Sequence, residues 1–161
     1  MTANLIVTDG HPTLRHEERA ALGSVLQNQL IDLIDLALLG KHLHWNLTGP
    51  DFQALHEHLD ELVAEWQERS DATAERGRAL GVAPDGQART VGAHSRLVEL
   101  APGEIRTDAV ITTLLGALDE TITRAREAME QAAEYDAVTE DLIIQTLATL
   151  EKQRWMVAAH R

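Results

Sequence analysis

Apolar residues recur along most of the chain at intervals of three and four, the spacing that places side chains on one face of an α-helix. From about His16 to Trp45 the repeating positions are Leu22, Leu26, Leu30, Leu33, Leu36 and Ala37. Similar patterns predict helices over 51–80, about 108–134 and about 140–160, with Thr139 as the N-cap of the last one. The alternation of β-branched and polar residues that indicates strands is absent from the sequence. The pattern therefore predicts an all-α protein.

Breaker residues divide the predicted helices into two pairs. Asn46-Leu47-Thr48-Gly49-Pro50 ends the first helix, and a short turn also joins the third helix to the fourth, so each pair should form an antiparallel hairpin. The 27 residues from Gly81 to Thr107 are enough to run the length of a 30-residue helix, which is about 45 Å. We predict one domain over 1–161, a ferritin-like four-helix bundle whose long crossover contains a short helix at 95–100. Residues 1–15 are predicted to form a flexible N-terminal tail.

Composition narrows the possible functions. The 161 residues include 26 Asp and Glu against 14 Lys and Arg, a formal net charge of −12, which disfavours nucleic-acid phosphates unless a basic patch exists. The absence of cysteine excludes disulfides, thiolate zinc sites and iron–sulfur clusters. Apolar runs are short, and the first ten residues lack the pattern of a secretory signal. We therefore expect a cytoplasmic protein that does not cross a membrane.

The predicted helix over 51–80 carries two stripes of different chemistry. The apolar stripe, expected to face the core, comprises Phe52, Leu55, Leu59, Leu62, Val63 and Trp66. The neighbouring stripe carries His56, Asp60, Asp71 and Glu75. Each half of this second stripe is an i,i+4 pair that can hold one cation. Imidazole with carboxylate suits iron, manganese or zinc, whereas carboxylates alone suit harder cations.

The two pairs cannot share a metal within one chain, because Asp60 and Asp71 are 11 residues apart, or about 16 Å along a helix. His56 and Glu75 have the same midpoint, 65.5, as Asp60 and Asp71, so an antiparallel copy of the helix crossing there sets His56 opposite Glu75 and Asp60 opposite Asp71. A twofold interface produces this arrangement automatically. We predict two equivalent metal sites, each shared by two subunits, with His44 as a further ligand. The competing interpretation is an ordinary solvated acidic face.

The residues around this stripe strongly resemble the Dps family, the miniferritins also called DNA-binding proteins from starved cells. The resemblance is carried by Lys41-His42-Leu43-His44-Trp45-Asn46-Leu47-Thr48-Gly49, Phe52, Leu55-His56, Asp60, Asp71-Ala72-Thr73-Ala74-Glu75-Arg76 and Leu80-Gly81. It implies a hollow homododecamer with ferroxidase centres at its twofold interfaces. One subunit would supply His44, His56 and Asp60, and its mate would supply Asp71 and Glu75. Trp45 matches a family tryptophan near the centre.

The resemblance also implies an activity. Family members oxidise Fe(II), preferably with hydrogen peroxide, and store ferric mineral inside the shell, which protects against oxidative stress. Asp136 and Asp141 resemble family acids that line threefold pores through which iron enters. The competing interpretation of these two acids is ordinary turn and helix-dipole chemistry, and Gln145 stands where some relatives have another acid.

Two other functions compete with the ferroxidase. A structural nucleoid protein would compact DNA with only incidental metal binding, but relatives that bind DNA often use Lys-rich tails. This chain has only Lys41 and Lys152, and its first 20 residues contain no lysine, so DNA binding is doubtful. A di-iron bundle with its site inside one subunit uses Glu-x-x-His motifs, and none occurs in the sequence.

Overall fold

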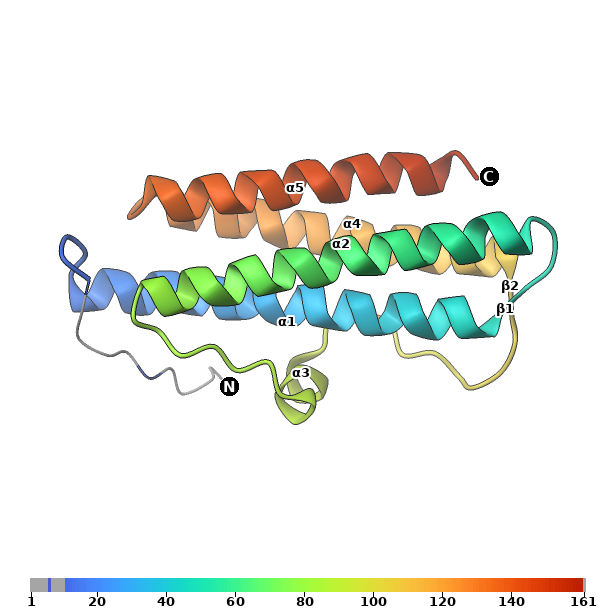
Figure 1. Ribbon diagram of the computed structural model, residues 1–161, viewed down its shortest axis with the longest axis horizontal. Helices are drawn as coiled ribbons and strands as arrows, with labels where there is room; N and C mark the ends of the chain where they lie inside the picture. The colour runs from blue at the N-terminus through green and yellow to red at the C-terminus, as the bar shows by residue number, and fades with distance from the viewer. Residues whose placement is uncertain (1–5, 7–10, 161) are drawn as a thin grey trace.

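The computed structural model describes residue 6 and residues 11–160. Its elements are α1 (His16–Asn46), β1 (Leu47–Thr48), α2 (Phe52–Ala79), α3 (Ala88–His94), β2 (Ile105–Arg106), α4 (Thr107–Ala133) and α5 (Ala137–Ala158). The four long helices lie side by side as two hairpins, α1 with α2 and α4 with α5 (Figure 1). The predicted all-α four-helix bundle is confirmed. The predicted tail falls largely on residues 1–5 and 7–10, which lie outside the described residues.

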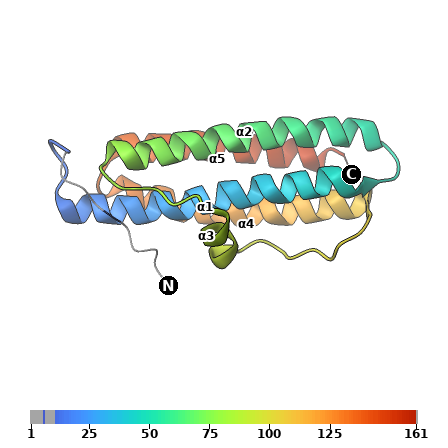
Figure 2. The ribbon, with the colours of Figure 1, turned by 60° about the horizontal axis from the view of Figure 1, so that its bottom comes forward.

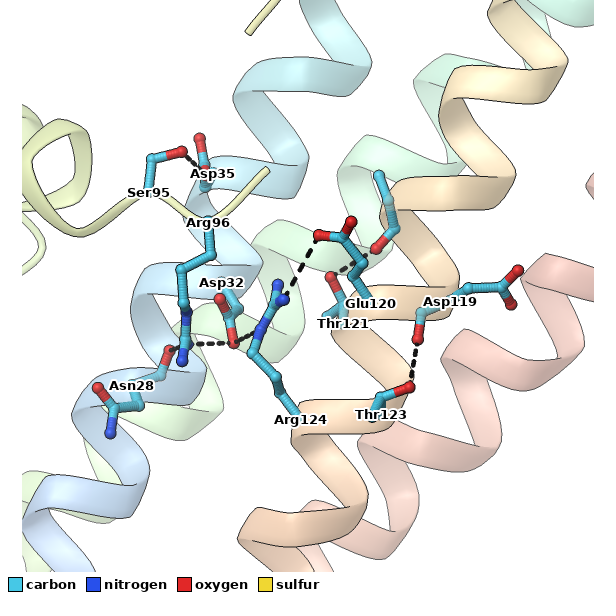
Figure 3. Close-up of polar contacts among 11 residues, drawn as sticks. Asn28, Asp32, Asp35, Ser95, Arg96, Asp119, Glu120, Thr121, Thr123 and Arg124 are labelled. Atoms are coloured by element: carbon cyan, nitrogen blue, oxygen red, sulfur yellow. Dashed lines mark hydrogen bonds and ion pairs between the residues drawn. The ribbon is translucent and has the colours of Figure 1, made fainter. Parts of the chain in front are cut away.

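The crossover between α2 and α4 runs along the bundle, as predicted (Figure 2). Its short helix is α3, so the predicted helix at 95–100 is wrong. Leu97 and Leu100 do pack against the core, but they reach it from irregular, non-helical chain that is held to α1 by the bonds of Ser95 and Arg96 to Asp35 and Asp32 (Figure 3). Apolar spacing alone could not distinguish these two ways of reaching the core.

A two-residue parallel bridge joins the turn after α1 to the end of the crossover. β1 pairs with β2 in the register Leu47↔Ile105 and Thr48↔Arg106. In the described part of the chain, β1 and β2 are the only strands. The Thr107 hydroxyl adds hydrogen bonds to the carbonyls of Thr48 and Pro50, so the turn that carries the end of α1 is held from both sides.

The start of α5 also differs from the prediction. The helix begins at Ala137, and its N-cap is Asp136 rather than Thr139. The Asp136 carboxylate accepts a 2.9 Å hydrogen bond from the amide of Thr139, which is the third residue of the helix. Thr139 instead lies fully buried within the first turn. The Thr139 amide has no acceptor within the helix, and the Asp136 side chain supplies one, so the helix begins directly after Asp136.

The apolar stripe of α2 faces the core as predicted, with one exception. Leu55, Leu59, Leu62, Val63 and Trp66 are buried. Phe52, the first residue of α2, is 44% exposed and stacks on the ring of His56 at 5.0 Å between centroids. The prediction that Phe52 belongs to the core is wrong, because the residue covers the histidine instead.

Close approach of α1 to α2 depends on a glycine. A Cβ atom built at Gly40 would lie 2.7 Å from both Val63 Cγ2 and Trp66 Cζ3. The Trp66 indole is fully buried, and its Nε1 donates a 2.7 Å hydrogen bond to Gln153 on α5. The absence of a side chain at Gly40 thus lets α1 lie against the largest core residue, four positions before His44.

α1 is long and apolar enough, by length and composition, to cross a membrane, and it is the one such helix in the part of the chain that the structure describes. Of its most apolar window, 72% is buried inside the bundle. Unbroken apolar runs did not reveal this property, because isolated polar residues such as Asp32 and Asp35 interrupt them. The composition of α1 is accounted for by its place in the core.

Candidate metal centre

Two histidines from neighbouring helices lie face to face at one end of the α1–α2 hairpin. His44 is in the last turn of α1 and is buried, whereas His56 is in the second turn of α2 and is half-buried. Their rings stack with centroids 3.6 Å apart and planes inclined by 22°. The short turn between α1 and α2, anchored by β1, brings the two rings together as the sequence predicted.

Reciprocal hydrogen bonds fix the orientation of both rings. His44 Nδ1 lies 3.0 Å from the carbonyl oxygen of His56, and His56 Nδ1 lies 3.2 Å from the carbonyl oxygen of His44. Because a carbonyl can only accept, each Nδ1 carries the proton, which leaves a lone pair on each Nε2 of the neutral ring. An imidazole held in this way by a carbonyl is the usual form of a histidine metal ligand.

The carboxylate of Asp60 lies beside the histidine pair, one helical turn after His56. Its Oδ1 is 3.4 Å from His44 Nδ1 and 2.7 Å from the Lys41 ammonium. The hydrogen bond from Lys41 lowers the pKa of Asp60 below its ordinary value and outweighs the opposing effect of burial. Asp60 is therefore an anionic oxygen donor, and a cation already lies against it.

Lys41 was not predicted from the sequence as part of this site. It stands 19 positions before Asp60 on a different helix, so no helical spacing connects the two residues. The same ammonium lies 5.6 Å from the centroid of the Trp45 ring. Trp45 itself is 72% exposed at the end of α1, so it lies beside the site without being packed into the core of this subunit.

Asp71 and Glu75 lie apart from the other three predicted ligands. Both are exposed on α2, and Asp71 is about 16 Å along the helix from Asp60. Among residue 6 and residues 11–160, no three His, Asp or Glu side chains lie close enough to hold a metal together. A single chain thus brings His44, His56 and Asp60 to one end of the α1–α2 hairpin without completing a three-ligand site, and it leaves Asp71 and Glu75 exposed on α2.

The two acids predicted at a pore lie near the start of α5. Asp136 is mostly buried, and its carboxylate accepts from Arg76 and from Thr139. Burial would raise the pKa of Asp136, but these hydrogen bonds outweigh burial and lower it. Asp141 is exposed and accepts a 2.7 Å hydrogen bond from Gln145. Both contacts are local to one chain, and the pore assignment stays a prediction.

A second histidine pair, which the sequence did not predict, lies between α2 and the end of α5. His58 Nδ1 is 3.1 Å from His160 Nε2, although the residues are 102 positions apart. Burial, and then the nearby charge of His160, lower the pKa of His58. His58 is half-buried at this contact.

Comparison with known proteins decides the family. The family model described as Ferritin-like domain matches residues 24–161. The DNA protection during starvation protein of Mycolicibacterium smegmatis is 35% identical over 153 residues, which cover 92% of this chain and 81% of that protein. The chain belongs to the Dps family. The solved structure of DpsA14 from Streptomyces coelicolor matches this Dps chain with a TM-score of 0.92 at 34% identity, covering 98% of this chain and 94% of that one.

One relative of this Dps protein is named as a pilus subunit. The fine tangled pili major subunit of Haemophilus ducreyi is 34% identical over 139 residues, which cover 86% of this chain and 74% of that protein. Dps proteins in general are oligomers that store iron and protect DNA, and the family is known for ferroxidase activity. Membership thus agrees with iron binding in general, and the assignment of His44, His56 and Asp60 as ligands stays a prediction.

Proposed function

We propose that this Dps protein oxidises Fe(II), preferably with hydrogen peroxide, and deposits ferric mineral inside a hollow shell of 12 identical subunits. The observation that carries the proposal is the histidine pair: reciprocal Nδ1 hydrogen bonds leave the Nε2 lone pair of each neutral ring available, and the Asp60 carboxylate lies 3.4 Å from His44 Nδ1. Two imidazoles and a carboxylate suit divalent iron. Oxidation of Fe(II) by peroxide inside a closed shell would protect the cell against oxidative stress.

The second half of each centre would come from a neighbouring subunit. Asp71 and Glu75 are exposed on α2, and their positions mirror those of His56 and Asp60 about the centre of the helix. A twofold partner packed against α2 would therefore add two carboxylates to the histidine half-site. The exposed Ala64 lies near that centre and leaves room for close contact between two copies of α2.

The ligand set would favour oxidation. Carboxylates and neutral imidazoles together stabilise Fe(III) more than Fe(II), because anionic oxygen donors interact more strongly with the higher charge. Two Fe(II) ions each release one electron to one hydrogen peroxide. Its O–O bond breaks and, with two protons, two waters form. This two-electron route avoids release of a hydroxyl radical, provided that both irons are held close together.

Replacing the histidine half-site tests the proposal. In His56→Ala/Asp60→Ala, loss of two ligands is expected to slow Fe(II) oxidation by peroxide at least about tenfold, the lower end of what even indirect damage to a metal site costs. Stopped-flow absorbance would measure the rate on protein of known size. The matched control, Glu57→Ala/Glu61→Ala, changes two exposed acids of the same helix and should oxidise iron normally. Unchanged kinetics in the first variant would contradict the site assignment.

A structural role on DNA is the second candidate, favoured by the name of the Mycolicibacterium smegmatis relative. Net charge and lysine content oppose it, because non-specific binding requires several phosphate contacts from basic groups. We expect no shift of supercoiled DNA in a gel titration at physiological salt. Tight binding there would place DNA compaction above iron storage. We infer a cytoplasmic location, and a nucleoid association would accompany DNA binding only.

A further inference from the structure

The histidine pair between α2 and the end of α5 has no part in the proposed oxidation of iron. His58 stands two positions after His56 on α2, so it lies about 200° around the helix from that predicted ligand. His160 lies just after α5, where its backbone amide donates a 3.1 Å hydrogen bond to the carbonyl of Val157. The fold thus brings two imidazoles from distant parts of the chain together at a second place.

The two rings meet nitrogen to nitrogen. His58 Nδ1 lies 3.1 Å from His160 Nε2, the ring centroids are 5.2 Å apart, and the ring planes are inclined by 32°. Metal–imidazole bonds of about 2.0–2.1 Å would bring both nitrogens onto one ion at an angle of about 100°. That angle lies between the ~90° of tetragonal and the ~109° of tetrahedral coordination. The spacing therefore suits two ligands of a single transition-metal ion.

Burial determines which nitrogen of His58 an ion can reach. His58 Nε2 is buried and has no hydrogen-bond partner in the described structure, so an ion arriving from solvent can be bound only by Nδ1. His160 is exposed and lines a groove of about 360 Å³ at this end of the bundle. An ion can therefore approach the pair from the side of His160.

Acidic side chains outnumber basic ones around the pair. Glu61 and Glu65 follow His58 on α2 and lie near enough for their negative charges to favour a positive charge there. Three charged residues line the same groove as His160: Asp51, Asp108 and Arg106. Arg106 lies 3.5 Å from Asp108, so its charge is partly compensated. Four acids against one arginine favour a bound cation.

We propose that His58 and His160 bind one divalent transition-metal ion, such as zinc or copper, which joins the end of α5 to α2. Imidazole suits zinc, copper and nickel, whereas magnesium and calcium prefer oxygen ligands. In the part of the chain that the structure describes, no third His, Asp or Glu lies close enough to complete the site. Water and the exposed Glu61, three positions after His58 on the same helix, would fill the remaining coordination positions.

A plain hydrogen bond between the two rings is the competing interpretation. An N–H and a lone pair 3.1 Å apart satisfy each other without a metal. The variant His160→Gln separates the two, because a glutamine amide can still donate to His58 Nδ1. Glutamine is not among the usual ligands of zinc, so the same variant removes half of the metal site.

The test is equilibrium dialysis of the metal-free, assembled protein against Zn(II) at neutral pH, with bound zinc counted per subunit. We expect His160→Gln to bind one zinc per subunit fewer than the original protein, or to bind that ion at least about tenfold more weakly. The matched control is His16→Gln, which alters an exposed histidine at the start of α1 and should bind zinc like the original. Equal zinc binding by His160→Gln and the original would overturn the proposal.

Zinc bound elsewhere does not affect this comparison. Any ion held at the proposed ferroxidase centre is common to all three proteins, since none of them changes His44, His56 or Asp60. The difference of one zinc therefore stands or falls separately from the proposed oxidation of iron.

A double variant tests whether both rings hold the same ion. His58→Gln should lose the same single zinc, and His58→Gln/His160→Gln should lose no more than either single variant, because one ion cannot be lost twice. Thermal unfolding would verify that the variants fold. Loss of two zinc ions in the double variant, or normal binding by a folded His58→Gln, would overturn the shared site.

Discussion

At the scale of single residues, chemistry depends on contacts that helical spacing does not reveal. The positions of His44 and His56 followed from the motif, but their reciprocal bonds to each other's carbonyls required the geometry of the turn. Lys41 on Asp60 was likewise outside the reach of the sequence, because the contact joins two helices. Residue type predicted which groups could bind metal, and the backbone determined which nitrogen of each ring is available.

Asp136 offers a residue-scale prediction about stability. Asp136→Ala removes the N-cap of α5 and the partner of Arg76, so it should lower the free energy of unfolding by about 1–2 kcal/mol at pH 7. Because the folded state lowers the pKa of Asp136, its stabilisation is present above the ordinary pKa and disappears as pH falls through the lowered value. Urea unfolding at neutral and strongly acidic pH should therefore show a deficit that shrinks in acid.

The control for that prediction lies one turn further along α5. Asp141→Ala removes an exposed acid whose described contact is a hydrogen bond to Gln145, and its effect should stay within about 0.5 kcal/mol. A deficit for Asp136→Ala that is equally large in acid would show that the charge of Asp136 plays no part.

At the scale of elements, periodicity predicted the four long helices to within a few residues, and it failed where local bonds decide. The N-cap of α5 depended on the carboxylate of Asp136, and the place of the short crossover helix depended on contacts with α1. Neither of these contacts follows the repeating spacing of apolar residues, so periodicity could not predict them. The prediction for Phe52 was wrong for a related reason. A helical-wheel projection places Phe52 on the apolar face, but it does not show that this first residue of α2 stacks on His56.

The close packing of α1 on α2 yields an element-scale prediction. Gly40→Ala would place a methyl group 2.7 Å from Val63 and Trp66, and such overpacking costs about 1–3 kcal/mol. Any separation of the two helices would lengthen the reciprocal histidine bonds four residues later, so Fe(II) oxidation should also slow. Thermal unfolding and stopped-flow kinetics would measure the two effects.

Gly116→Ala is the matched control for the packing of α1 on α2. Gly116 lies within α4, and a Cβ atom built there meets nothing within 4 Å. Because alanine is the better helix former, this substitution should stabilise the protein by about 0.4–1 kcal/mol and leave iron oxidation unchanged. Equal effects of the two substitutions would show that the contact at Gly40 is unimportant.

At the scale of the whole molecule, the proposed centres depend on pairs of subunits, and a mixing experiment tests this. Shells built only of His56→Ala/Asp60→Ala subunits, or only of Asp71→Ala/Glu75→Ala subunits, should each oxidise Fe(II) at least about tenfold more slowly than the original protein. Co-assembly should restore about a quarter of the original activity, because half of randomly formed pairs are mixed and each mixed pair has one intact centre of two. Steady-state peroxide consumption with Fe(II) would measure the recovery. Absence of recovery in normally assembled mixed shells would contradict shared centres.

The symmetry of α2 shows how far sequence reasoning extends at this scale. His56 with Glu75 and Asp60 with Asp71 share one midpoint, which predicted a twofold partner. Within a single chain these residues are too far apart to share a metal. The exposure of Asp71 and Glu75 agrees with that reasoning. The ion pairs of Asp32 with Arg96 and Arg124 could not be predicted, since the three residues come from α1, the crossover and α4 and share no spacing.

The small bridge between β1 and β2 has a consequence for the order of folding. Leu47 and Ile105 stand 58 positions apart, whereas the α1–α2 and α4–α5 hairpins join neighbours across short turns. Closing the longer loop costs more chain entropy, so both hairpins should form before the bridge does. A ribosome would therefore release the finished α1–α2 hairpin, histidines already stacked, before the crossover arrives to lock its turn.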